Sequence, residues 1–200
     1  MEVTVLRAAL VVVDVQRDFC PGGTLAVREG DKVVPGLNRT IVAFEKIKLP
    51  IFFTRDWHPP NHVSFKSQGG TWPPHCIQGT EGAEFHPDLR IPLGATIISK
   101  GDRPKEEAYS GFQGTDLAAR LNKLGTEDLF LGGLATDYCV KQTTLDARAA
   151  GFSVTVLGDC ISAVDVIPGD GDRALAEMKG VGAKSTKSSE AVKILAGRRP

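Results

Sequence analysis

The stretch Ala8-Ala9-Leu10-Val11-Val12-Val13 is apolar at every position and is followed at once by the acidic Asp14. An unbroken apolar run of this length is typical of a strand that is buried on both faces, as in a parallel sheet covered by helices on both sides. We therefore predict a central strand over 8–13. We also expect the Asp14 side chain to lie where this strand ends.

Similar apolar runs alternate with helical patterns along the rest of the chain. Four further strands are predicted at 51–54, 95–98, 129–131 and 154–157. Apolar residues at helical spacing predict helices over 31–48, around 117–121, over 138–150 and over 172–179. This alternation predicts a doubly wound α/β fold with three α/β/α layers, a Rossmann-like topology and a mostly parallel sheet of about six strands.

The predicted strand at 129–131 is followed by two glycines, Gly132 and Gly133, where we expect a turn. A second exception to the regular pattern is the segment 55–94, which is rich in Pro, Gly, His and Trp. Loops of this length inside a compact domain usually serve function. The tail from Ala183 onward is predicted to add a late edge element and to end in a frayed segment at about 190–200.

Length and composition limit the classes of protein to which the chain can belong. Its 200 residues suit a single domain, 1–200, with one sizeable core. Lys plus Arg and Asp plus Glu number 24 each, so no excess of positive charge points to nucleic acid. No apolar run approaches the length that spans a membrane. We expect a small-molecule ligand and no nucleic-acid or membrane partner.

The cysteines and the N-terminus suggest where the protein acts. The four cysteines are scattered and include no Cys-x-x-Cys pair, and the first seven residues lack the features of a signal peptide. Both observations indicate reduced thiols in the cytoplasm.

Ionisable residues follow the predicted strands at the edge where parallel α/β sheets bind ligands. Asp14 follows the first strand, Lys100 the third, and Cys139 stands where the fourth gives way to a helix. A helix N-terminus and a nearby cation both favour a thiolate, so Cys139 is a candidate nucleophile, with Asp14 as its base. Cys139 could equally be a small core thiol, and Asp14 and Lys100 a structural ion pair.

A second group of side chains resembles a metal site. Asp56 and His58 lie two residues apart and point the same way in an extended segment, and His75 follows in the same long loop. Two imidazoles and one carboxylate suit a divalent ion with an open position, zinc above all, with iron or manganese as alternatives. His62 is either a fourth ligand or a residue that supports the ligands. An Asp-x-His pair alone could also be a surface pair without function.

Aromatic residues in the segments near this edge could form a pocket for a flat ring or could simply pack at the loop bases. The candidates are Phe19, Trp72 and Tyr109. We assign structural roles to His86, Cys20 and Cys160.

The chain resembles the isochorismatase-like cysteine hydrolases, and within them the nicotinamidase (pyrazinamidase) branch. The matching stretches are Val13-Asp14-Val15-Gln16-Arg17-Asp18-Phe19, Arg55-Asp56-Trp57-His58, Thr71-Trp72-Pro73-Pro74-His75-Cys76, Lys100-Gly101, Tyr109-Ser110-Gly111-Phe112 and Gly133-Leu134-Ala135-Thr136-Asp137-Tyr138-Cys139-Val140. The resemblance implies hydrolysis of nicotinamide to nicotinate and ammonia through a cysteine thioester, with pyrazinamide as a side substrate.

The resemblance also implies a role for each matching residue. Asp14, Lys100 and Cys139 would form the catalytic triad, and Asp56, His58 and His75 would hold the metal. Phe19, Trp72 and Tyr109 would bind the ring together with Ala135. A cis peptide between Leu134 and Ala135 would direct the Ala135 N–H into an oxyanion hole shared with the Cys139 N–H. Members of the family range from monomers to larger assemblies, so a homo-oligomer is compatible with the resemblance.

Two other functions remain open on the sequence alone. One is a related cysteine amidohydrolase that acts on a carbamoyl or ureido substrate. The other is a non-catalytic protein in which Cys139 is a sensor thiol and the metal is structural.

Overall fold

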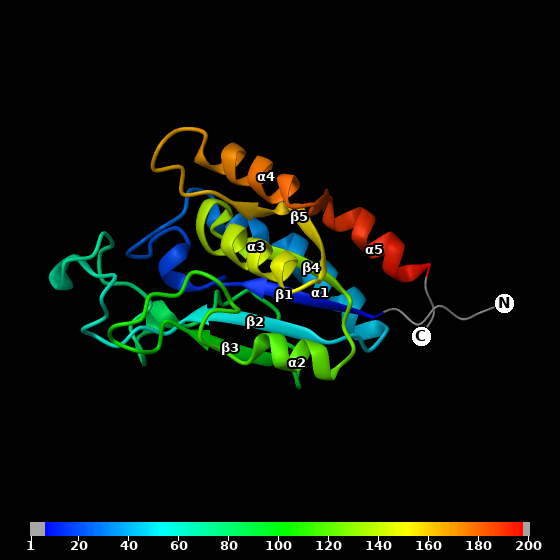
Figure 1. Ribbon diagram of the computed structural model, residues 1–200, viewed down its shortest axis with the longest axis horizontal. Helices are drawn as coiled ribbons and strands as arrows, with labels where there is room; N and C mark the ends of the chain where they lie inside the picture. The colour runs from blue at the N-terminus through cyan, green and yellow to red at the C-terminus, as the bar shows by residue number, and fades with distance from the viewer. Residues whose placement is uncertain (1–6, 198–200) are drawn as a thin grey trace.

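The computed structural model describes residues 7–197 and contains a parallel sheet in the strand order β3-β2-β1-β4-β5-β6 (Figure 1). The strands are β1 (Ala8–Val13), β2 (Ile51–Asp56), β3 (Thr96–Lys100), β4 (Asp128–Leu134), β5 (Ser153–Ser162) and β6 (Lys184–Thr186). The predicted six-stranded doubly wound fold is confirmed, and the strand at 8–13 is its centre.

Helices cover both faces of the sheet. They are α1 (Val34–Lys46), α2 (Leu117–Lys123), α3 (Lys141–Ala149), α4 (Asp170–Gly180) and α5 (Ser188–Ala196). Residues of α1 and α5 share one hydrophobic core, whereas residues of α2, α3 and α4 share the core on the other face. The structure therefore has the three predicted layers.

Strand β1 contributes to both cores because successive side chains of a strand point to opposite faces. Leu10 and Val12 belong to the core beneath α1, and Ala9 and Val11 belong to the other. All of them have no accessible surface. This two-sided burial is why the strand carries no polar residue before Asp14.

The prediction of a turn at Gly132 and Gly133 is wrong, because both glycines lie inside β4. Gly133 is paired with Val13 of β1 and has φ of 133°, and a Cβ there would lie 2.0 Å from the Val13 carbonyl oxygen. The two glycines let β4 approach its neighbours closely. They extend the strand to Leu134 and bring its end to the same edge of the sheet as Asp14.

The prediction of a frayed tail at about 190–200 is also wrong for most of its length. The edge strand β6 is followed by α5, whose Ala191 and Leu195 are buried in the core shared with α1. Apolar residues at three- to four-residue spacing give this helix one face to bury, which offsets the entropy of ordering it. Residues 198–200 of the predicted tail, and 1–6 at the N-terminus, lie outside the described residues.

From β1 the chain adds β2 and β3 on one side of the sheet, and from β4 it adds β5 and β6 on the other side. The strand order therefore reverses between β1 and β4. In open α/β sheets a crevice forms at such a switch point, beyond the carboxyl ends of the strands. Figure 1 shows much of the long connection between β2 and β3 gathered at this end, and the start of β1 and the end of α5 at the other. The fold therefore provides one place where residues after β1, β2, β3 and β4 can meet.

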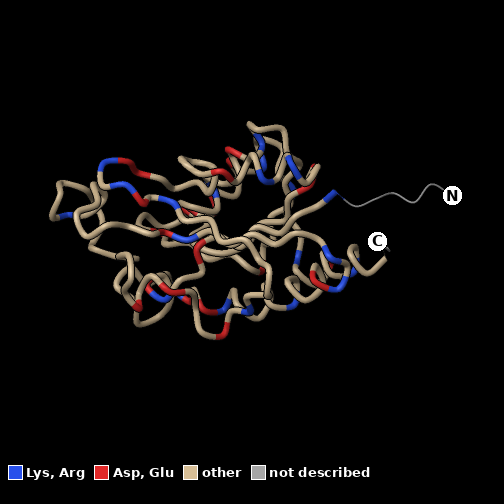
Figure 2. The backbone as a smooth tube through the Cα atoms, turned by 90° about the horizontal axis from the view of Figure 1, so that it is seen from below, with Lys and Arg blue, Asp and Glu red and all other residues tan. Residues whose placement is uncertain are grey.

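Along the backbone that the structure describes, the charged residues form no region of a single sign (Figure 2). Figure 2 shows acidic and basic residues interspersed along the loops and helices, in agreement with the equal numbers of the two charges. Among the described residues, no helix combines the length and apolar character needed to span a membrane.

Candidate active site

Lys100 contacts both of the other residues that the sequence predicts as a catalytic group, Asp14 and Cys139. Its Nζ lies 3.0 Å from Oδ2 of Asp14 and 3.5 Å from Sγ of Cys139, and it donates a hydrogen bond to the carbonyl of Ala108. Thr54 donates to the other Asp14 oxygen at 2.6 Å. Asp14, Lys100 and Cys139 are all at least 94% buried, with exposed fractions of 0%, 1% and 6%.

Burial and ion pairing act against each other on the pKa of Asp14 and on that of Lys100, and the net shift of both pKa values is upward. Burial raises the pKa of Asp14 and outweighs the lowering by Lys100, so this carboxyl holds a proton more readily than usual. Burial lowers the pKa of Lys100, but the carboxylates of Asp14 and Asp56 raise it well above its ordinary value. The lysine therefore remains a cation inside the protein.

The prediction that the surroundings favour a Cys139 thiolate is not met in the resting site. Burial raises the pKa of the Cys139 thiol well above its usual range, and the Asp14 and Asp56 carboxylates add to this effect against the lowering by Lys100. Cys139 lies in a π-helical turn, Thr136–Val140, directly before α3. The geometry thus presents a neutral thiol beside a carboxylate that can accept its proton.

Asp56, His58 and His75 converge as the sequence predicts. One potential ligand atom from each lies within 4.8 Å of those of the other two, and all three residues are buried. Oδ2 of Asp56 is 3.6 Å from Nε2 of His58 and 3.9 Å from Nε2 of His75. These three residues could hold a metal ion with an open position for a further ligand.

The remaining nitrogens of the two imidazoles are held by the backbone. Nδ1 of His58 donates to the carbonyl of Gly101 at 2.9 Å, and Nδ1 of His75 donates to the carbonyl of Pro73 at 2.8 Å. A histidine that donates through one nitrogen presents the lone pair of the other, which is the usual arrangement of metal-bound imidazoles. Both Nε2 atoms are therefore prepared as ligands.

His62 is placed to support the site and not to bind an ion. Its Nδ1 accepts from the Ser64 hydroxyl at 2.7 Å, and its Nε2 donates to the carbonyl of Glu106 at 3.0 Å. With both nitrogens engaged, no lone pair is free for a metal. The ring instead stacks on His58 with centroids 4.1 Å apart. Of the two roles that the sequence left open for His62, the geometry favours the supporting one.

Gln16 fixes the position of Asp56, a role that the sequence analysis missed. Its side-chain amide donates to the carbonyls of Asp56 and Ala83, and its side-chain oxygen accepts from the Asp56 N–H, each at 2.8 Å. The only sequence signal for this role was an amide side chain three residues beyond the end of the first strand. His75 is positioned similarly, because the carboxylate of Asp18 accepts from the N–H of the adjacent Cys76 at 2.7 Å.

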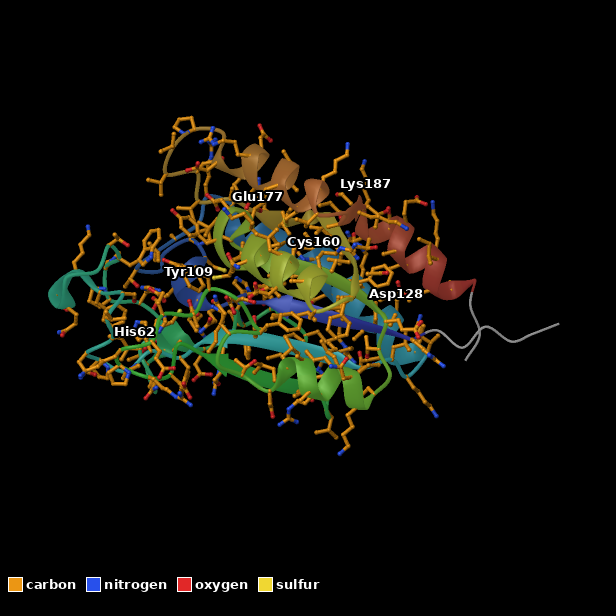
Figure 3. All side chains as sticks on the ribbon, viewed as in Figure 1. His62, Tyr109, Asp128, Cys160, Glu177 and Lys187 are labelled. Atoms are coloured by element: carbon orange, nitrogen blue, oxygen red, sulfur yellow. The ribbon has the colours of Figure 1, made fainter. Side chains whose placement is uncertain are left out.

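A pocket opens beside Cys139 and the three predicted ligands Asp56, His58 and His75. The predicted aromatic residues Phe19, Trp72 and Tyr109 line it, and Nε1 of Trp72 donates to the Tyr109 hydroxyl at 2.9 Å. Figure 3 places Tyr109 and His62 at the loop end of the sheet, and Asp128, which begins β4, toward the other. The aromatic pocket and the ionisable cluster thus form one site.

Several pocket residues could not be found from the sequence. Tyr138 packs edge-on against Trp72, with centroids 5.0 Å apart, and also contacts Tyr109. Leu25 and Val164 complete the apolar walls. Leu25 and Val164 come from segments with no motif, and Tyr138 has no signal beyond its place next to Cys139.

The peptide between Leu134 and Ala135 is cis, as the family resemblance implies. Ala135 and Cys139 both line the pocket. The structure agrees with the structural roles assigned to three further residues. Cys20 and Cys160 are buried free thiols, and Nδ1 of His86 accepts a hydrogen bond from the Asp88 N–H at 3.2 Å.

Comparison with known proteins agrees with this architecture. Residues 8–190 match the isochorismatase domain. The chain is 40% identical over 196 residues to a nicotinamidase of Escherichia coli, a match that covers 88% of this chain and 92% of the relative.

Two solved structures are similar over nearly their whole length. A pyrazinamidase of Pyrococcus horikoshii, solved in complex with zinc, is 50% identical with a TM-score of 0.87, covering 90% of this chain and 99% of that one. PnC1 of L. infantum, solved in complex with nicotinate, is 37% identical with a TM-score of 0.85, covering 94% and 96%. The chain belongs to the isochorismatase family.

Proposed function

We propose that this protein hydrolyses nicotinamide to nicotinate and ammonia, with Cys139 as the nucleophile and pyrazinamide as a side substrate. The observation that carries the proposal is the position of Lys100, which contacts the base Asp14, the nucleophile Cys139 and the ligand Asp56. A structural ion pair would need only one of these contacts. The similarity to nicotinamidases and to a pyrazinamidase supports the choice of substrate.

We further propose that Asp56, His58 and His75 hold one divalent ion, with zinc preferred over iron or manganese. Two imidazole nitrogens and one carboxylate oxygen are suitable donors for zinc, and the zinc complex of the similar pyrazinamidase supports this choice. When bound, the ion would offer an open coordination position to the ring nitrogen of a pyridine or pyrazine. The adjacent walls, Phe19 and Trp72, would hold the flat ring.

In the first half of the reaction, the Cys139 sulfur attacks the carboxamide carbon while its proton passes to Asp14. Lys100 remains protonated and stabilises the negative charge that passes from the carboxylate to the sulfur and the substrate. The N–H groups of Ala135 and Cys139 would hold the oxyanion, each donor being worth about 3 kcal/mol of transition-state stabilisation. Asp14 then returns the proton to the departing nitrogen, and ammonia leaves a thioester on Cys139.

In the second half, water attacks the thioester carbon and gives a proton to Asp14. The carbon–sulfur bond breaks, the sulfur recovers its proton, and nicotinate leaves. Asp14 thus alternates between base and acid, a task that suits a buried carboxyl whose pKa is above its usual value. The thiol proton leaves in ammonia, one water proton passes through Asp14 to the sulfur, and the other leaves on the carboxylic acid product, which loses it to solvent and becomes nicotinate.

One experiment separates this proposal from its two rivals. The purified protein is incubated with nicotinamide and with a ureido compound, each with and without a chelator, and ammonia is measured. The proposal expects release from nicotinamide that the chelator abolishes. Release from the ureido compound alone would indicate the related amidohydrolase, and release from neither would indicate a non-catalytic protein.

We also propose a cytoplasmic location. All four cysteines are free thiols in the structure, and thiols persist where the surroundings are reducing.

A further inference from the structure

Among residues 7–197, Glu107 is the pocket-lining acid to which the proposed reaction gives no role. It lines the pocket together with Trp72, Tyr109 and Cys139, and it lies two residues before Tyr109 at the open rim, where it is exposed. The other acidic member of the lining, Asp56, is buried against Lys100. Of the two acids in the lining, Glu107 is thus the exposed one at the rim.

The carboxylate of Glu107 is held at this rim. Its Oε1 accepts from the N–H of Ala108 at 3.1 Å, and the Ala108 carbonyl accepts in turn from Nζ of Lys100 at 3.1 Å. The neighbouring Glu106 is neutralised by Arg103, but within residues 7–197 no basic side chain forms an ion pair with Glu107. Its negative charge thus has no ion-pair partner in this part of the chain and lies beside the pocket.

The field of this charge reaches the pocket wall. Burial raises the pKa of the Tyr109 hydroxyl, and the hydrogen bond with Trp72 lowers it. The negative charge of Glu107 adds to the increase. A neutral amide entering the pocket experiences little of this field, whereas an anion is repelled by it. The proposed reaction converts a neutral amide into a carboxylate in this same pocket.

We propose that Glu107 makes the pocket discriminate between neutral amides and anionic carboxylates, so that it weakens inhibition by the product. This inference rests on the proposed function and deepens it. Glu107 is here a specificity-determining residue and takes no part in bond formation. If Glu107 acts in this way, ring amides that carry a second, anionic substituent should also be poor ligands.

The test compares the binding of nicotinate with that of nicotinamide in variants of Glu107. In the metal-loaded enzyme, Glu107→Gln should lower the inhibition constant of nicotinate roughly three- to fivefold and Glu107→Lys should lower it further, with the KM of nicotinamide changing less than twofold. Raising the ionic strength to about 0.5 M should shrink these differences. Calorimetric titration with nicotinate gives a second readout that does not depend on turnover.

Asp102→Asn is the matched control, because Asp102 is an exposed acid of the same segment that does not line the pocket. It should leave the inhibition constant unchanged. The proposal is overturned if Glu107→Gln and Glu107→Lys bind nicotinate no more tightly than the wild type, or if Asp102→Asn has the same effect as they do. Wild-type protein that neither binds nor hydrolyses nicotinamide would instead contradict the proposed function itself.

Discussion

Asp56 and Lys100 form a buried ion pair that connects the proposed metal site to the nucleophile Cys139. One oxygen of Asp56 contacts Nζ of Lys100, and the other faces Nε2 of His58 at 3.6 Å. Burial alone would raise the pKa of Asp56, but Lys100 and His58 lower it far below the usual range, so Asp56 keeps its negative charge. The two halves of the site therefore share one carboxylate.

This sharing predicts different results for two ligand substitutions. His75→Gln removes a ligand but leaves the Asp56–Lys100 pair intact, so metal content should fall at least tenfold and excess zinc should restore part of the activity. Asp56→Asn removes a ligand and the charge that Lys100 needs, so zinc should restore no activity. Metal analysis and ammonia release measure both effects. Equal rescue of the two variants by zinc would show that the pair is not required.

Lys100→Met should destabilise the protein strongly. It leaves the buried carboxylates of Asp14 and Asp56 without a cation, and removal of one partner from a buried ion pair typically costs about 3–5 kcal/mol. Urea unfolding measures the loss. Lys193→Met is the control, because that lysine forms an exposed pair with Glu190, and it should hardly change the free energy of unfolding. Similar losses for both variants would contradict the role of Lys100.

Gly101→Ala should disturb the metal site through His58. A Cβ at Gly101 would lie 2.5 Å from Cε1 of His58, and Gly101 has φ of 61°. Gly114→Ala is a matched control, since its φ is 67° and nothing lies within 4 Å of the added Cβ. Both variants carry the same backbone strain, but only Gly101→Ala should lose metal and activity, by about tenfold or more. Equal metal content in the two would contradict this account.

Tyr138→Ala should weaken substrate binding more than it slows the chemistry. The ring contacts both Trp72 and Tyr109, so its loss opens the aromatic wall. We expect KM for nicotinamide to rise about tenfold, a loss in the range of one or two aromatic contacts. Tyr138→Phe keeps the ring and should keep KM, as steady-state kinetics would show. An unchanged KM in the alanine variant would exclude Tyr138 as a binding wall.

The fold could be predicted because burial leaves a direct pattern in the sequence. The unbroken apolar run at 8–13 identified a strand covered on both faces, and its end located Asp14. Gly132 and Gly133 were misjudged because the atoms that leave no room for a side chain are far away in sequence: Leu37 and Cys160 at Gly132, and the Val13 backbone at Gly133. Helix α5 was missed because its partner α1 lies about 150 residues earlier in the chain, and only the fold brings the two together.

The candidate site was predictable where residue type alone indicates chemistry. Asp14, Asp56, His58, Lys100 and Cys139 end or closely follow strands, so topology brings them together. His75 lies in the long connection between β2 and β3, and only its residue type identified it. Side chains that act through shape gave no such signal, as with Leu25 and Val164. The state of the Cys139 thiol also could not be predicted, because the sequence shows the cation but not the extent of burial that opposes it.

The most direct test of the central claim is ammonia release from nicotinamide by Cys139→Ala beside Cys160→Ala. Both substitutions remove a buried free thiol, but only Cys139 lies within reach of Lys100 and the pocket. The account predicts that Cys139→Ala binds its metal and has no measurable activity, while Cys160→Ala retains most of it. Appreciable ammonia release by folded, metal-loaded Cys139→Ala would contradict the account.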